Sequence, residues 1–89
     1  MPNAQTYAQM HRKFLEQAHP EVLAKLTPEE LKERLASVGK TAVETYDLLD
    51  HQMRTSPKLP TDFRQRMEAV NAIPVAVEEI VLQEVVYVL

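Results

Sequence analysis

Apolar side chains recur at steps of three and four along most of the chain, which is the spacing of one face of an α-helix. The first such stretch runs from about Asn3 or Ala4 to Ala18. It ends there because the residue before Pro20 is disfavoured in the helical region, and Pro20 itself suits the first turn of a short helical piece. The inner face of the first helix comprises Tyr7, Met10, Phe14, Leu15 and Ala18.

A second, longer helix is predicted from Pro28 to about Met53. Thr27 supplies an N-cap hydroxyl, Pro28 a first-turn proline and Glu30 the reciprocal carboxylate of a capping box. Gly39, the only glycine, costs about 1 kcal/mol relative to alanine inside a helix. It therefore indicates a bend, a close backbone contact or a break. The apolar face comprises Leu31, Leu35, Val38, Ala42, Leu49 and Met53, with Thr45 or Tyr46 between.

The segment Arg54 to Thr61 contains Ser56, Pro57 and Pro60 and is predicted to be a hairpin loop. A last helix follows, and Pro74 predicts a kink or a fresh start near residues 71 to 74. The abundance of valine and isoleucine near the end leaves a strand open for Val85 to Leu89. The apolar positions of this last helix are Phe63, Met67, Val70, Ile73, Val77, Ile80, Val81, Leu82, Val85 and Val88.

These elements predict an all-α fold: a single domain over residues 1–89, built as a small antiparallel bundle of three main helices plus a short helical turn. The stretch from Ile73 to Leu89 is apolar almost all the way round, and such a helix needs cover on more than one side. The expected core comprises Tyr7, Met10, Phe14, Leu15, Leu31, Leu35, Val38, Leu49, Met67, Val70, Val77, Ile80 and Val81.

Composition agrees with a folded, soluble protein, since 45% of the residues are apolar and 26% charged. The chain has no cysteine, hence no disulfide, no thiolate nucleophile and no cysteine-based zinc site. No signal-peptide pattern opens the sequence, and the C-terminal apolar run is shorter than the ~20 residues that span a bilayer. We therefore expect a cytoplasmic protein that does not enter membranes.

Charge is segregated along the chain although its net value is only −3. Residues 28–53 sum to −3 and residues 67–89 to −4, whereas residues 54–66 sum to +3. The basic set Arg54, Lys58, Arg64 and Arg66 is a candidate anion-binding or DNA-binding cluster, although solvated loops commonly carry such residues. The acidic helix faces leave open an anti-defence inhibitor that mimics nucleic-acid phosphates.

A helix-turn-helix is disfavoured by electrostatics. Its reading helix would begin near Lys40 and would carry Glu44, Asp47 and Asp50 toward DNA phosphates. Nucleic acid is accordingly not the favoured partner.

Motifs for catalysis and for metal binding are missing from the sequence. It has no glycine-rich phosphate loop, no His-Glu-x-x-His and no nucleophile elbow. Glu16 with His19, and Glu44 and Asp47 with His51, share helix faces, but a carboxylate-bridged metal in a bundle needs ligands from four helices. We expect no catalytic residue, no cofactor, no metal and no enzymatic activity.

Two segments of the chain resemble the small transposon-encoded TnpV-like proteins of bacterial mobile elements. The first comprises Phe14, Leu15, Glu16, His19 and Pro20; the second, the better match, comprises Asn71, Ile73, Glu78, Glu79, Ile80, Val81, Leu82, Glu84 and Tyr87. Pro74 departs from the family pattern. The resemblance implies a helical protein carried on a mobile element, without implying a reaction.

The excess of apolar surface predicts a protein-interaction module, an accessory protein of a mobile element that self-associates or binds another protein. A homo-oligomer is the expected state. The predicted anchors are Val81, Val85, Val88 and Leu89.

Overall fold

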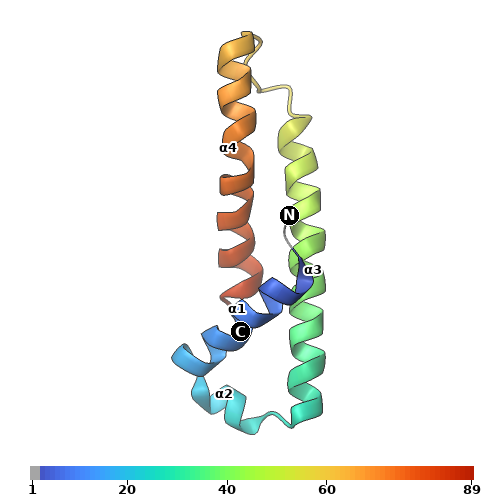
Figure 1. The fold of residues 1–89 in the computed structure, drawn as a ribbon, viewed down its shortest axis with the longest axis vertical. Helices are drawn as coiled ribbons and strands as arrows, with labels where there is room; N and C mark the ends of the chain where they lie inside the picture. Colours follow the sequence, from blue (N-terminus) through green and yellow to red (C-terminus); the bar gives the residue numbers. More distant parts are fainter. Residues whose placement is uncertain (1–2) are drawn as a thin grey trace.

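The computed structural model describes residues 3–89, and its largest feature is an antiparallel pair of long helices (Figure 1). They are α3, Pro28–Arg54, and α4, Phe63–Val81. The shorter α1, Ala4–Ala18, lies across the lower half of this hairpin, and α2, Pro20–Lys25, leads from α1 to the start of α3 (Figure 1). The molecule measures 53 × 19 × 17 Å, so it is a rod rather than a sphere. The predicted all-α fold is confirmed.

Local capping explains where the helices begin. The side chain of Asn3 accepts a hydrogen bond from the Thr6 amide, and the side chain of Asp62 accepts one from the Gln65 amide. The predicted capping box is present, since the Thr27 hydroxyl and the Glu30 carboxylate each accept from the other residue's amide. Each contact satisfies an amide that has no partner within its own helix.

The helix α4 runs through Pro74 without interruption, so a fresh start near residues 71 to 74 does not occur. Proline has no amide hydrogen, and the carbonyl of Val70 therefore lacks its usual partner four residues later. The strand left open for Val85 to Leu89 is also absent: a π-helical turn, η1, Leu82–Val86, continues α4. Val86 is buried there, and helical continuation is what places it against the other helices.

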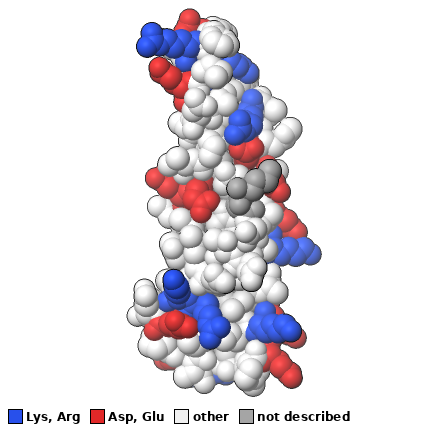
Figure 2. All heavy atoms as spheres, in the orientation of Figure 1, with Lys and Arg blue, Asp and Glu red and all other residues white. Residues whose placement is uncertain are grey.

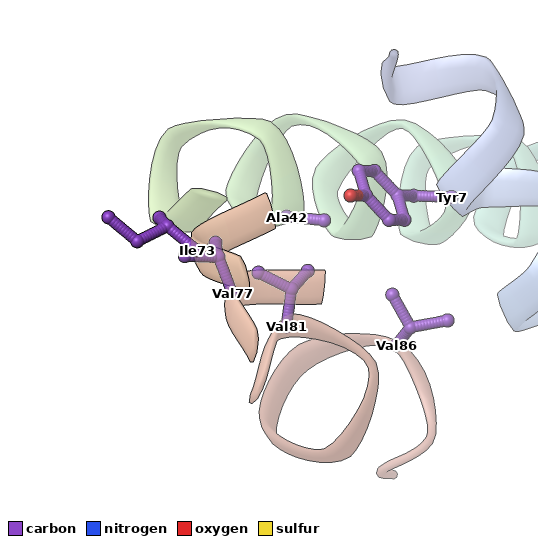
Figure 3. Packing of buried hydrophobic residues seen from close by; sticks show 6 residues of the cluster. All are labelled: Tyr7, Ala42, Ile73, Val77, Val81 and Val86. Atoms are coloured by element: carbon purple, nitrogen blue, oxygen red, sulfur yellow. The ribbon is translucent and has the colours of Figure 1, made fainter. Parts of the chain in front are cut away.

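The apolar core lies where α1, α3, α4 and η1 meet (Figure 3). Its buried members are Tyr7, Ala42, Ile73, Val77, Val81 and Val86, and Leu15 is buried as well. Most other residues expected in the core are half-buried at its edges: Met10, Phe14, Leu31, Leu35, Val38, Leu49, Val70 and Ile80.

Met67 was expected in the core, and that prediction is wrong. It remains 47% exposed, and Phe63, one turn earlier on α4, is 78% exposed. Both lie near the tip of the hairpin, beyond the reach of α1, where α4 packs only against α3 (Figure 1). Periodicity identifies an apolar helix face, but a third helix has to reach that face before it is buried.

Gly39 marks a close backbone contact, one of the roles anticipated for it. A Cβ atom built on Gly39 would lie 2.3 Å from the Ala4 carbonyl oxygen. The first turn of α1 therefore lies directly on the α3 backbone. α3 continues through Gly39 without a break.

Replacing Gly39 by alanine should push the first turn of α1 away from α3. We expect Gly39→Ala to lower the free energy of unfolding by about 1–3 kcal/mol, despite the better helix propensity of alanine. The control is Ser37→Ala, at an exposed position of the same helix, which should be neutral or slightly stabilising. Urea unfolding followed by circular dichroism measures both. A Gly39→Ala protein as stable as the Ser37→Ala protein would contradict the close contact.

Candidate functional site

The outer half of the hairpin is not covered by α1. We call residues 45–72 the arm; it comprises the end of α3, the loop and the first half of α4, and extends beyond the N-terminus of α1 (Figure 1). A pair of helices can bury only the faces turned toward each other. The arm therefore exposes large apolar side chains, including Leu48, Phe63 and Met67.

One side of the arm continues the surface on which α1 lies. Phe63, Met67, Val70 and Pro74 follow steps of four, three and four along α4, and Glu78 comes one turn later on the same stripe. Because the Glu78 carboxylate meets Tyr7 of α1, this stripe faces the α1 side of the hairpin. On α3 the matching stripe comprises Tyr46, Asp50 and Met53. We call these two stripes the open face.

A pocket lies at the foot of the open face, where the first turn of α1 crosses. Its volume is about 490 Å³. The Tyr7 hydroxyl donates a 2.6 Å hydrogen bond to Oε2 of Glu78, whereas no residue among 3–89 donates to the other carboxylate oxygen, Oε1. The lining residues are Asn3, Thr6, Tyr7, Tyr46, Pro74, Val75, Glu78 and Glu79.

The pKa values of the two tyrosines that line this pocket are raised, first by burial and then by neighbouring carboxylates. Burial and then the Glu78 carboxylate raise the pKa of Tyr7 well above the ordinary tyrosine value. Burial, followed by the charges of Asp50 and Glu78, likewise raises the pKa of Tyr46. Ionising either phenol would place a negative charge beside carboxylates, so both tyrosines retain their protons. The pocket therefore combines aromatic rings with carboxylates.

The four basic residues of the candidate anion-binding cluster lie at and near the tip of the hairpin, where basic side chains are visible (Figure 2). Arg54 is partly neutralised by Asp50, with Nε 3.0 Å from the carboxylate, and Arg64 lies 3.9 Å from Glu68. Lys58 and Arg66 form no ion pair within residues 3–89. These two cations are exposed and available to a ligand from outside.

The C-terminal anchors expected from the sequence differ in exposure. Val81 is fully buried in the core and Val85 is half-buried, whereas Val88 and Leu89 are 41% and 63% exposed. Tyr87 lies beside Val88, and its ring centroid is 5.8 Å from that of Phe14. Much of the apolar C-terminal segment is thus covered by the chain's own helices, which leaves Tyr87, Val88 and Leu89 as a small outer patch.

A buried polar junction holds this C-terminal segment to α1 and α3. His11 is fully buried, and its Nδ1 lies 2.7 Å from the Val86 carbonyl oxygen. Its Nε2 accepts a 3.1 Å hydrogen bond from Nε of Arg34, and Arg34 also donates to the Leu89 carbonyl oxygen at 3.0 Å. An accepting Nε2 carries no proton, so Nδ1 is the donor to Val86. Carbonyls at the end of a helix lack intrahelical partners, and His11 and Arg34 supply them.

The sequence reasoning missed His11 as a core residue. The signal that could have found it is its position on α1, four residues after Tyr7 and four before Leu15, since both neighbours on that stripe are buried. A polar residue in the middle of a buried stripe needs hydrogen-bond partners. Those partners come from α3 and η1, which lie far away in the sequence.

The two side chains considered as metal ligands near the end of α1, Glu16 and His19, each pair with another side chain. Glu16 pairs with Arg12 at 3.1 Å, and His19 Nδ1 lies 3.3 Å from Glu21. Over residues 3–89, no three histidine, aspartate or glutamate side chains come together in a group that could hold a metal ion.

These observations define the class: an all-α protein built on a helical hairpin, braced at one end by a shorter helix and carrying an open apolar face at the other. The chain belongs to the family of the transposon-encoded protein TnpV, whose family model matches residues 2–86. The resemblance seen in the sequence is thereby confirmed, and the protein is associated with transposons. Comparison with curated proteins and with solved structures finds no match. None of the helices within residues 3–89 combines the length and the hydropathy that crossing a membrane requires.

Removing the His11 side chain should loosen the junction between α1, α3 and η1. We expect His11→Ala to cost about 2–4 kcal/mol, because it leaves a cavity and removes the partners of the Val86 carbonyl and the Arg34 guanidinium. His51→Ala, at an exposed position of α3, should stay within about 0.5 kcal/mol of the unchanged protein. Thermal and urea unfolding measure both. Equal stability of the two variants would show that the junction is not structural.

The burial of Tyr7, together with its hydrogen bond to Glu78, should make stability fall in alkali. The raised pKa of Tyr7 means that, above about pH 10, the unfolded chain loses this proton while the folded protein keeps it. Stability present below pH 10 is therefore lost as the pH rises further. Tyr7→Phe should reduce the slope of unfolding free energy against pH between about 10 and 11. Part of the slope should remain, because the pKa of Tyr46 is raised as well. An unchanged slope would contradict this origin; Tyr87→Phe, which leaves the carboxylate contact intact, is the control.

Proposed function

We propose that this transposon-encoded protein is a non-enzymatic interaction module that self-associates, two copies pairing through the open faces of their arms. The observation that carries the proposal is that the chain has more solvent-accessible surface than a compact protein of the same mass. The chain exposes 6430 Å², whereas a compact monomer of 10.2 kDa exposes about 5300 Å². The excess of about 1100 Å² agrees with the elongated shape of the molecule, to which the arm contributes.

The size of this excess suits a dimer. A stable interface of standard size buries about 800 Å² on each partner. Pairing through the open face would hide Phe63 and Met67, which are 78% and 47% exposed in the single chain. Large exposed apolar side chains grouped on one face are typical of interaction surfaces.

Charge along the open face supports a second copy as the partner. The tip carries Lys58 and Arg66, which form no ion pair within residues 3–89, whereas Glu78 and Glu79 line the pocket at the foot. Two arms packed antiparallel bring the tip of each against the foot of the other, so opposite charges meet twice. A two-fold interface requires this kind of self-complementary surface.

The resulting assembly would be an antiparallel four-helix bundle at its centre. Each hairpin supplies two helices there, as in bundles built from paired hairpins. The helices α1 of the two copies would then flank the bundle at opposite ends. Along α4 the apolar stripe of the open face runs from Phe63 to Pro74, about 17 Å, which is long enough for roughly three helical turns of packing.

The outer C-terminal patch of Tyr87, Val88 and Leu89 is the other apolar surface that could bring copies together. Val88 and Leu89 are the exposed members of the anchors expected from the sequence. We favour the arm because its apolar stripe extends over about three turns of α4, whereas the patch is three consecutive residues and Val81 and Val86 before it are already buried.

Substitutions on the two surfaces show whether the copies pair through the open face or through the C-terminal patch. We expect the unchanged protein to have twice the monomer mass by light scattering at micromolar concentrations. Met67→Glu places a charge on the open face and should raise the dissociation constant at least 100-fold, because pairing of the two copies would bury an unpaired charge in the interface. Leu89→Glu should leave the dimer intact. The reverse pattern would assign the interface to the C-terminal patch, and a monomeric unchanged protein would refute self-association.

A further inference from the structure

The pocket at the foot of the open face has the composition of a site for a guanidinium group. Tyr46 supplies an aromatic ring, and Pro74 and Val75 supply apolar walls for the methylene part of a side chain, whereas Tyr7, only 2% exposed, contributes mainly its hydroxyl. Glu78 and Glu79 supply negative charge at the same place. Aromatic rings beside a carboxylate bind organic cations through cation–π and ionic contacts, and the planar guanidinium of arginine fits best.

Glu78 is held ready for such a contact. Tyr7 fixes the carboxylate by donating to Oε2, so the side chain loses little freedom when it binds a cation. Within residues 3–89 no group donates to Oε1, and the side chain is half-buried rather than free in solvent. A carboxylate partly withdrawn from water attracts a cation more strongly than an exposed one.

The antiparallel pairing of two arms presents a specific arginine to this pocket. An axis passing near Val70, close to the midpoint of the open face on α4 from Phe63 to Glu78, places residue 66 of one copy opposite residue 74 of the other. Arg66 thus lies opposite Pro74, which lines the pocket. Glu78 is one helical turn further, about 6 Å along the axis, and an arginine side chain spans that distance.

Among the arginines of residues 3–89, Arg66 is the one with neither an ion pair nor a side-chain hydrogen bond. Arg54 and Arg64 have carboxylate partners within the hairpin, whereas Arg66 forms no ion pair within residues 3–89. On α4 it follows Phe63 by three residues and precedes Val70 by four, so it lies beside the apolar stripe of the open face.

We propose that the pocket formed by Tyr7, Tyr46 and Glu78 receives the Arg66 side chain of a second copy. Two such contacts, one at each end of the interface, fix the antiparallel register of the dimer. This inference rests on the self-association proposed above and specifies its register. The apolar stripe alone would permit neighbouring registers that differ by one helical turn, and the arginine contacts discriminate between them.

The test is a double-mutant cycle on the dimer dissociation constant, measured by sedimentation equilibrium at low salt. Glu78→Gln keeps an oxygen for the Tyr7 hydroxyl and removes the charge, and Arg66→Gln removes the guanidinium. Each should weaken the dimer about tenfold, because each substitution acts at both ends of the interface. The double variant should be no weaker than either single one, since the second change then removes nothing further.

Matched controls remove a charge outside the contact. Arg64→Gln on the same helix and Glu84→Gln on η1, both exposed, should leave the dissociation constant within about twofold. Arg66→Lys should recover only part of the affinity, because lysine lacks the planar group. Circular dichroism and thermal unfolding of Glu78→Gln verify that the monomer still folds.

The outcomes distinguish the two proposals. A dimer whose affinity is unchanged by Arg66→Gln and Glu78→Gln, or whose losses simply add in the double variant, overturns the arginine contact and leaves self-association standing. A protein that stays monomeric at every concentration overturns both.

Discussion

The contact between the first turn of α1 and Gly39 fixes where the short helix lies along the hairpin, and the other features follow from that position. α1 has 15 residues and α3 has 27, so at about 1.5 Å per residue α1 is roughly 18 Å shorter. Because Gly39 anchors its N-terminal end near the middle of α3, the proximal half of the hairpin is buried and the arm is left bare. The open face thus results from a mismatch in helix length.

The covered half is held by polar contacts as well as by apolar packing. Tyr7 reaches Glu78 on α4, and His11 and Arg34 reach the carbonyls at the end of the chain. Each contact joins elements more than 20 residues apart and is satisfied in only one arrangement of the helices. These contacts therefore specify how α1 sits, and Tyr7 and Glu78 also shape the pocket in which we place the arginine of a second copy.

Local signals predicted the helices well. The capping box at Thr27, the prolines of the 54–61 loop and the steps of three and four residues all act within one or two turns, so they can be recognised in the sequence. The resemblance to TnpV-like proteins held over the length of the family match. The candidate site was predicted less well: basic residues at the tip were noted, but Tyr46 and Glu78 lie about 30 residues apart in sequence, and nothing local indicated that they line one pocket.

The amino-acid sequence by itself determined which segments are helical and which faces of them are apolar, because capping and periodicity are short-range properties. Only the tertiary structure decided which apolar faces are covered. Met67 and Val77 both belong to the apolar pattern predicted for the last helix, yet Val77 is buried and Met67 stays exposed. The difference comes from where a short helix ends against a long one, and the pattern along a single helix carries no information about that.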